Sequence, residues 1–253
     1  MGRVSDKVAI VSGAGSGIGR ATALLLAEEG ARLVVADVAE DSGEATVEQI
    51  RALGGEAIFV RTDVTQDADC ANLVAAALAR YERLDIAFNN AGIVGYPLLT
   101  AEYGTANWQR VIDVNLTGVF NCMTHEIPAM KQTGGGSIVN TASIMGLLGA
   151  VGGSAYCAAK HGVIGLTKAA SLEYGRNGIR VNAVCPGYVE TPMTVGDDSI
   201  FPSRKLQDGI GRAAIRRMAT PAEVGEMVVW LSSDRASYIT GASFPVDGGV
   251  TAG

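Results

Sequence analysis

Short apolar runs alternate with longer amphipathic segments along the chain. Each run has the length of a strand and is apolar at successive positions, as is typical of strands buried on both faces. We expect strands at residues 7–12, 31–37, 56–60, 84–89, 137–141, 179–184 and 242–246. The segments between them place apolar residues near a 3.6-residue period. They predict helices at residues 17–29, 40–53, 66–81, 106–131, 154–174 and 221–232.

Strands that alternate with helices predict an α/β fold, a doubly wound parallel sheet with helices on both faces. The chain has no proline- or serine-rich linker and no repeat beyond the strand–helix unit. Residues 1–253 are therefore expected to form a single domain. Ligands of such sheets bind beyond the carboxyl ends of the strands, so the residues that follow each strand are the candidates for chemistry.

The composition narrows the range of partners. A net charge of −6, without a cluster of Lys and Arg, argues against nucleic acid. The uncharged stretch between Lys131 and Lys160 is interrupted by glycines, so we expect no membrane span, and the first residues do not resemble a signal peptide. The four cysteines form no CxxC pair and no metal-ligand spacing with the two histidines. This pattern indicates reduced thiols in a cytoplasmic protein and no metal site.

The first predicted strand leads through a glycine-rich turn, residues 12–19, into the first helix. Glycines let the backbone approach a pyrophosphate closely, and the start of the helix offers free N–H groups. Gly13, Gly17 and Gly19 give the spacing GxxxGxG rather than GxGxxG. The alternative is a tight turn without a ligand, but the position between the first strand and the first helix favours phosphate binding.

Asp37 ends the second predicted strand. A carboxylate there can accept hydrogen bonds from the ribose hydroxyls of an adenosine, although an aspartate that only caps a turn is the alternative. The next residue is Val38, and no basic residue stands between Gly13 and Gly19. A 2′-phosphate would meet a negative charge without a cation to offset it, so the sequence favours NAD over NADP.

Polar residues follow the other strands as well. Asp63 could receive an adenine amino group or be an ordinary loop aspartate. The amide of Asn90 could hold the loop beside a cofactor, which is as much a structural role as a binding one. Asn115 is unfavourable inside a predicted helix, and the hydroxyl of Ser143 could hold a substrate oxygen. The remaining candidates at these strand ends are Val64, Ala91, Gly92, Pro186, Gly187 and Thr191.

Tyr156 and Lys160 lie four residues apart on a predicted helix. Positions i and i+4 share a helix face, so the ammonium is expected close to the phenol. A free phenol has a pKa of about 10 and is a poor acid–base catalyst at neutral pH. A nearby cation would lower that pKa toward neutrality. A surface helix pair is the alternative, and the candidates at the neighbouring strand ends argue against it.

In this order along one chain, the motifs resemble those of the short-chain dehydrogenase/reductase family. The resemblance covers residues 7–249, and Ser12 keeps the hydroxyl of the family's usual threonine. It implies a Rossmann-type fold and hydride transfer between a nicotinamide and a secondary alcohol or ketone. The matching motifs are residues 12–19, Asp63, residues 89–92, Asn115, Ser143, Tyr156 with Lys160, Pro186-Gly187 and residues 246–249.

The resemblance also implies roles for single residues. Tyr156 would be the general base for oxidation and the acid for reduction, and Ser143 would polarise the substrate oxygen. Lys160 would lower the pKa of the phenol and contact the nicotinamide ribose, while Asn115 would hold a water in a proton path. Members are commonly homotetramers that pair two long helices. The implied cofactor-binding set is Ser12, Gly13, Gly15, Ser16, Gly17, Ile18, Gly19, Asp37, Asp63, Val64, Asn90, Ala91, Gly92, Tyr156, Lys160, Pro186, Gly187, Val189 and Thr191.

The substrate side of the pocket is expected from residues 94–98, 144–153 and 188–217, the last a substrate lid. The second segment is apolar and the third contains both apolar residues and cations, which favours an apolar or cyclic secondary alcohol or ketone as substrate. One alternative is an NADPH-dependent 3-ketoacyl-carrier reductase of the same family, which the Asp37 argument opposes. Another is a non-catalytic NAD-binding sensor, which would have no need to keep Ser143, Tyr156 and Lys160.

Overall fold

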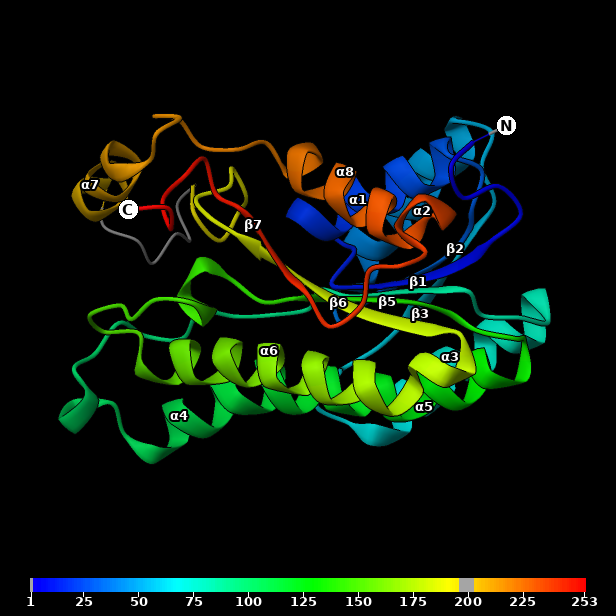
Figure 1. Cartoon of the computed structure of the whole chain (residues 1–253), viewed down its shortest axis with the longest axis horizontal. Helices are drawn as coiled ribbons and strands as arrows, with labels where there is room; N and C mark the ends of the chain where they lie inside the picture. Colours follow the sequence, from blue (N-terminus) through cyan, green and yellow to red (C-terminus); the bar gives the residue numbers. More distant parts are fainter. Residues whose placement is uncertain (1, 196–202) are drawn as a thin grey trace.

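The chain folds around a parallel β-sheet (Figure 1). The computed structural model describes residues 2–195 and 203–253. Within that range the sheet has seven strands in the order β3-β2-β1-β4-β5-β6-β7, and each neighbouring pair is parallel. The strands are β1 (Val8–Ser12), β2 (Arg32–Asp37), β3 (Ala57–Arg61), β4 (Ile86–Asn89), β5 (Gly136–Thr141), β6 (Ile179–Pro186) and β7 (Ser243–Val246).

Helices cover both faces of the sheet, so the predicted doubly wound fold is confirmed (Figure 1). One face carries α1 (Gly17–Glu28), α2 (Glu40–Ala52) and α8 (Pro221–Ser232), and the other carries α3 (Asp67–Tyr81), α4 (Thr105–Ile112), α5 (Gly118–Gln132) and α6 (Ser154–Tyr174). Short 3₁₀ turns lie at Thr100–Glu102, Ile144–Gly146, Gly175–Asn177 and Asp234–Ala236. Among the described residues, no helix combines the length and apolar character needed to cross a bilayer.

Two apolar layers hold the helices to the sheet. The layer on one face contains Leu26 of α1, Ile50 of α2 and Val228 of α8. The layer on the other face contains Leu73 of α3 and Val163 of α6. All of them are essentially inaccessible to solvent, and each such side chain stabilises the fold by about 1.5–3 kcal/mol. Inner strands such as β1 and β2 are buried on both faces, which explains their unbroken apolar runs.

The predicted helix over residues 106–131 is interrupted. A π-helical turn, Asp113–Thr117, separates α4 from α5. The side chain of Asn115 lies in this turn and donates to the carbonyl of Val111, 2.9 Å away. A wide turn of this kind is common at functional sites and leaves the 3.6-residue apolar period nearly intact, so the sequence pattern could not reveal it.

The segment after β6 forms a loop whose ends are joined. The N–H of Ala219 donates to the carbonyl of Tyr188, and the N–H of Glu190 donates to the carbonyl of Ala219, both at 2.9 Å. Helix α7 (Ser203–Arg212) lies within the loop and was not predicted, because few of its positions are apolar enough to show a period. The expected lid residues 196–202 lie outside the described range.

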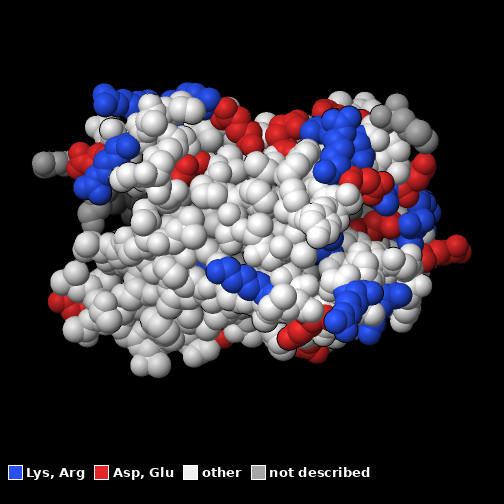
Figure 2. All heavy atoms as spheres, in the orientation of Figure 1, with Lys and Arg blue, Asp and Glu red and all other residues white. Residues whose placement is uncertain are grey.

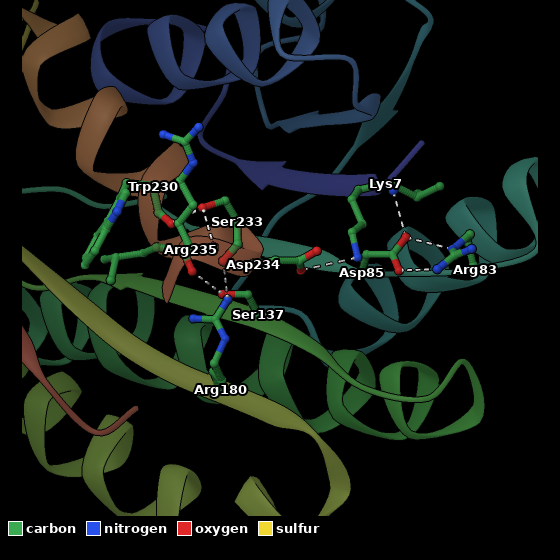
Figure 3. Close-up of polar contacts among 11 residues, drawn as sticks. Lys7, Arg83, Asp85, Ser137, Arg180, Trp230, Ser233, Asp234 and Arg235 are labelled. Carbon is green, nitrogen blue, oxygen red and sulfur yellow. Dashed lines mark hydrogen bonds and ion pairs between the residues drawn. The ribbon is translucent and has the colours of Figure 1, made fainter. Parts of the chain in front are cut away.

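A separate polar cluster holds the amino ends of the strands (Figure 3). The buried carboxylate of Asp85 accepts from the N–H of Val8 at 2.9 Å and from the guanidinium of Arg83 at 2.6 and 2.8 Å. Lys7 lies 3.8 Å from Asp234. These contacts join β1, β4 and the turn after α8 at the edge opposite the ligand edge, so we assign them to the fold.

Candidate active site

A cavity of about 640 Å³ opens at the carboxyl ends of the strands. It lies where the strand order reverses, between β1 and β4, as expected for ligands of a doubly wound sheet. Most of the predicted site residues meet there. The ones that line the cavity are Gly13, Ser16, Gly17, Ile18, Asp37, Asp63, Val64, Asn90, Ala91, Gly92, Asn115, Ser143, Tyr156, Lys160, Pro186, Gly187, Val189 and Thr191.

Three predicted residues, Ser12, Gly15 and Gly19, do not line the cavity and instead support its wall. The hydroxyl of Ser12 accepts from the N–H groups of Asn90 and Ala91 at 3.0 and 3.2 Å. A Cβ on Gly19 would lie 2.1 Å from the carbonyl oxygen of Gly13, so this position needs glycine for close packing. These contacts shape the glycine turn, and a role of these residues in cofactor binding stays a prediction.

The glycine turn exposes its backbone to the cavity. Gly13 and Gly17 line the cavity and have φ angles of 62° and 52°, a region that favours glycine. The side chain of Asn90 donates to the carbonyls of Ser12 and Gly13, both at 3.2 Å. The end of β4 thereby fixes the turn before α1, and the N-terminus of α1 faces the cavity with free N–H groups.

Asp37 lies beside this turn at the end of β2. Its Oδ2 accepts from the N–H of Gly15 at 2.8 Å, and its Oδ1 accepts from the N–H of Ala39 at 2.9 Å. Each carboxylate oxygen has a further lone pair, and the side chain lines the cavity. The turn-capping role and the ligand-binding role proposed from the sequence are therefore compatible.

Arg20 is a basic residue next to the glycine turn that the sequence analysis did not weigh. Its guanidinium donates to the carbonyl of Gly15, to the carbonyl of Ser42 at 3.2 Å and to the hydroxyl of Thr46 at 3.0 Å. These hydrogen bonds hold the guanidinium of Arg20 against the backbone of the glycine turn and the start of α2. The residues that line the cavity do not include it.

Tyr156, Ser143 and Lys160 lie together on the other side of the cavity. Tyr156 and Lys160 come from the first turns of α6, and Ser143 follows β5. Tyr156 is hydrogen-bonded to Ser143. The Nζ atom of Lys160 donates to the carbonyl of Thr141 at 2.7 Å and lies 5.6 Å from the centre of the Tyr156 ring. The i, i+4 pair predicted from the sequence is thus on one helix face, and it is not a surface pair.

The expected fall in the pKa of the Tyr156 phenol is wrong for this structure. Burial raises that pKa to about 12, although the hydrogen bond with Ser143 acts in the opposite direction. Burial also lowers the pKa of Lys160 to about 8. Desolvation is the largest influence on the phenol, and the ammonium of Lys160 is engaged by the carbonyl of Thr141.

Asn115 holds the loop after β4. Its Oδ1 accepts from the N–H of Ile93 at 3.2 Å, and its Nδ2 donates to the carbonyls of Ile93 and Val111 at 2.8 and 2.9 Å. A Cβ on Gly92 would lie 2.7 Å from this Oδ1, so the loop can approach Asn115 only with glycine at that position. The buried side chain therefore has a clear structural role at the wall of the cavity.

Several lining residues were not predicted. Most stand next to a predicted one, so adjacency to a strand end was the signal that could have found them. Arg110 lies one helical turn before Val114, and both reach the cavity from the α4 side. The additional lining residues are Val38, Thr62, Thr65, Ile93, Arg110, Val114, Thr141 and Ala142, whereas Pro192, Met193 and Thr194 belong to the predicted segment 188–217.

The fold is a doubly wound α/β sheet, and its cavity brings the glycine turn together with Ser143, Tyr156 and Lys160. The chain matches the family model described as enoyl-(acyl carrier protein) reductase over residues 13–251. It belongs to the short-chain dehydrogenase/reductase family, a family of oxidoreductases.

Curated relatives align along nearly the whole chain. The chain is 46% identical to cyclohexanol dehydrogenase of Acinetobacter sp. (strain SE19), with 98% of this chain and 96% of the relative covered. It is 44% identical to cis-4-hydroxycyclohexanecarboxylate dehydrogenase of Sinomonas cyclohexanicum, with 98% of each covered. The solved carveol dehydrogenase of Mycobacterium avium, in complex with NAD, superposes with a TM-score of 0.95 at 31% identity over 100% of both chains.

Proposed function

We propose that the protein is an NAD-dependent dehydrogenase of a cyclic secondary alcohol, with Tyr156 as its acid–base group. The observation that carries this proposal is the shared cavity. Tyr156, Ser143 and Lys160 line one part of it, and Asp37 and the glycine turn line another. A dinucleotide that spans these parts would bring its reactive end to the phenol.

The residues of the cavity fit a dinucleotide. Gly13 and Gly17 leave backbone N–H groups open to a pyrophosphate, and Asp37 can accept from ribose hydroxyls. Asp63 and Val64 would border the adenine, while Lys160, Pro186, Gly187, Val189 and Thr191 would border the nicotinamide end. When bound, NAD supplies the acceptor or donor of the hydride.

The chain's own residues would move the proton. The hydroxyl of Ser143 would hold the substrate oxygen beside the phenol of Tyr156, which removes the proton in oxidation and returns it in reduction. With a pKa near 12, the phenol keeps its proton at neutral pH and is ready to donate it. Lys160 is the cation available to stabilise the phenolate, and it loses its own charge as the pH rises through about 8.

NAD is favoured over NADP by the charge around the ribose site. Asp37 faces the cavity, and the nearby Arg20 is engaged with the loop. A 2′-phosphate would therefore be repelled without compensation. The solved relative that contains NAD supports the same assignment.

A cyclic substrate is supported by the relatives, and an apolar one by the side chains that precede α6. Both curated relatives described above are named for cyclohexane alcohols. Ile144 is buried behind Ser143, whereas Leu147, Leu148 and Val151 present apolar side chains to solvent before α6. Met193 lines the cavity from the segment after β6.

The second candidate is an NADPH-dependent 3-ketoacyl-carrier reductase. The description of the matching family model, a reductase of acyl carrier protein substrates, is the observation in its favour. Asp37 argues against it, because NADPH carries the 2′-phosphate that this carboxylate would repel.

A substrate screen tests both candidates. Cyclic and open-chain secondary alcohols would be offered with NAD and NADP, and a 3-ketoacyl thioester with NADPH, while absorbance of the reduced nicotinamide is followed. We expect turnover of cyclic alcohols with NAD. Tyr156→Phe should lose it, and Tyr238→Phe, at a fully exposed tyrosine, serves as the matched control. Reduction of the thioester alone would refute the alcohol dehydrogenase.

Wider features of the molecule remain predictions. They are the single domain over residues 1–253, a substrate lid over residues 188–217, a cytoplasmic location and a homotetramer. The last is supported by a groove of about 490 Å³ between α5 and α6, and by Phe120 and Leu172, which are 51% and 86% exposed. The surface over α6 carries few charged side chains (Figure 2).

A further inference from the structure

A buried polar cluster lies on the far side of the cavity wall, between the sheet and helices α5 and α6. It consists of Asn89 at the end of β4, Asn140 in β5, Glu126 in α5 and Thr167 in α6, each at most 2% exposed. Nδ2 of Asn89 donates to Oε2 of Glu126 at 3.0 Å and to Oδ1 of Asn140 at 3.1 Å. Nδ2 of Asn140 donates to the hydroxyl of Thr167 at 3.0 Å.

Two oxygens of this cluster have no hydrogen-bond partner, Oδ1 of Asn89 and Oε1 of Glu126. Both are acceptors, and they belong to the two side chains that already share a hydrogen bond. A proton on Oε1 would let the carboxyl donate to Oδ1 of Asn89 while Oε2 still accepts from Nδ2. One proton would thus satisfy both atoms and remove a buried charge.

Exchanging the oxygen and nitrogen of the Asn89 amide does not remove this requirement. The exchanged amide would turn its oxygen toward Oε2 of Glu126, and that contact again needs a proton on the carboxyl. We infer that Glu126 is a neutral carboxylic acid in the folded protein and that it positions Asn89 through a paired acid–amide contact.

Among the described residues, no cation acts on the pKa of Glu126. Cys122 lies one helical turn before Glu126 in α5, its thiol is 3.7 Å from that of Cys70 in α3, and its own pKa is raised, mainly by the contact with Cys70 and by burial. β4 and β5 contribute the amides of Asn89 and Asn140, and the ammonium of Lys160 in α6 is bonded to the carbonyl of Thr141. Burial raises the pKa of Glu126 to about 7, and its hydrogen bond to Asn89 only partly opposes this.

The cluster lies directly beneath the site. Asn89 precedes Asn90, which fixes the glycine turn, and Asn140 precedes Thr141, whose carbonyl holds Lys160. Ionisation of Glu126 would remove the proton from the paired contact and place a charge below both strand ends. Glu126 is therefore a positioning residue for the site, and this last step rests on the proposed function.

The test compares Glu126→Gln and Glu126→Leu with the unmodified protein. Glutamine can form the same paired contact with Asn89 and never ionises, whereas leucine removes the contact. Glu48→Gln, at an exposed acid on α2, controls for the loss of one negative charge. The first readout is the infrared signal of a protonated carboxyl at pH 6, which we expect in the unmodified protein and in Glu48→Gln but not in Glu126→Gln.

The second readout is the folding equilibrium constant from urea unfolding. The pKa of Glu126 is about 7 in the folded state and 4.5 in the unfolded state. The folded state is therefore favoured at low pH, and this contribution is lost as the pH rises through about 7. Relative to Glu126→Gln, the constant of the unmodified protein should fall by about 30-fold between pH 5.5 and 8. In the same interval its kcat/KM should fall relative to that of Glu126→Gln.

A missing carboxyl signal, or a constant ratio between the two folding equilibria across this interval, would overturn the inference. So would a Glu126→Gln variant that matches Glu126→Leu in activity at pH 6, because the paired contact would then be irrelevant to the site. The infrared and unfolding readouts do not depend on turnover. If the proposed alcohol dehydrogenase activity were absent, they would still decide the state of Glu126.

Discussion

Replacing Asp37 with asparagine should weaken the preference for NAD over NADP. The substitution keeps the size of the side chain and removes its charge. Oδ1 can still accept the hydrogen bond from the N–H of Ala39, which is 2.9 Å long in the unmodified protein. The new NH₂ group would face the N–H of Gly15 in place of Oδ2, so that N–H loses its acceptor. We expect a loss of about 1 kcal/mol in the free energy of unfolding from this change.

The magnitude of the cofactor effect follows from the charge that is removed. Two unit charges about 4 Å apart repel by about 4 kcal/mol at an effective dielectric constant near 20. Asp37 is partly exposed, so about half of this remains after screening. A change of about 2 kcal/mol corresponds to roughly a 30-fold narrowing of the NAD-to-NADP ratio of kcat/KM.

The assay measures kcat/KM for both cofactors at a fixed, saturating alcohol concentration. Asp63→Asn is the matched control, because it also removes a carboxylate from the cavity, but one that is bonded to Thr65 and not to the glycine turn. It should affect both cofactors alike and leave their ratio unchanged. Equal use of NAD and NADP by the unmodified protein would refute the reasoning, as would an Asp37→Asn variant whose ratio stays the same.

Three further changes probe the rest of the site. Tyr156→Phe should reduce turnover by roughly 10²- to 10⁴-fold with NAD affinity nearly intact, and near-normal oxidation by the folded variant would rule out the phenol as acid–base group. Lys160→Met removes the only cation near the phenol among the described lining residues on the α6 side. The pH–rate profile should therefore move to higher pH, and NAD should bind more weakly. An unchanged profile would limit Lys160 to a role in binding. Enlarging a cyclohexanol-type substrate by one buried CH₂ should raise kcat/KM by about fourfold until the cavity fills, from about 0.8 kcal/mol per group, and a screen in which only anionic substrates react would contradict the apolar pocket.

The sequence predicted the strands and the common location of most candidate site residues, because these depend on local apolar patterns and on position at strand ends. The seven strands lie where the apolar runs predicted them, and most candidate residues meet at one edge of the sheet because parallel strands end there together. The supporting role of Ser12 and Gly19 could not be predicted, since it depends on the approach of β4 to the glycine turn.

The electrostatic prediction failed for a related reason. The spacing of Tyr156 and Lys160 places the two side chains on one helix face, but it does not reveal how deeply each is buried. The hydrogen bond from Lys160 to Thr141 links residues that are distant in the chain. Burial then raises one pKa and lowers the other, against the direction that the pair alone would suggest.

The joined ends of the loop after β6 have a consequence for protein engineering. Tyr188 and Glu190 are held to Ala219 by backbone hydrogen bonds, so the intervening residues begin and finish at nearly the same point. Closing a longer or shorter loop between fixed ends changes the free energy only by about 0.6 kcal/mol for each doubling of length. Loops of different length could therefore be closed between Glu190 and Ala219 at little cost in stability, which makes this segment a natural place for engineered insertions.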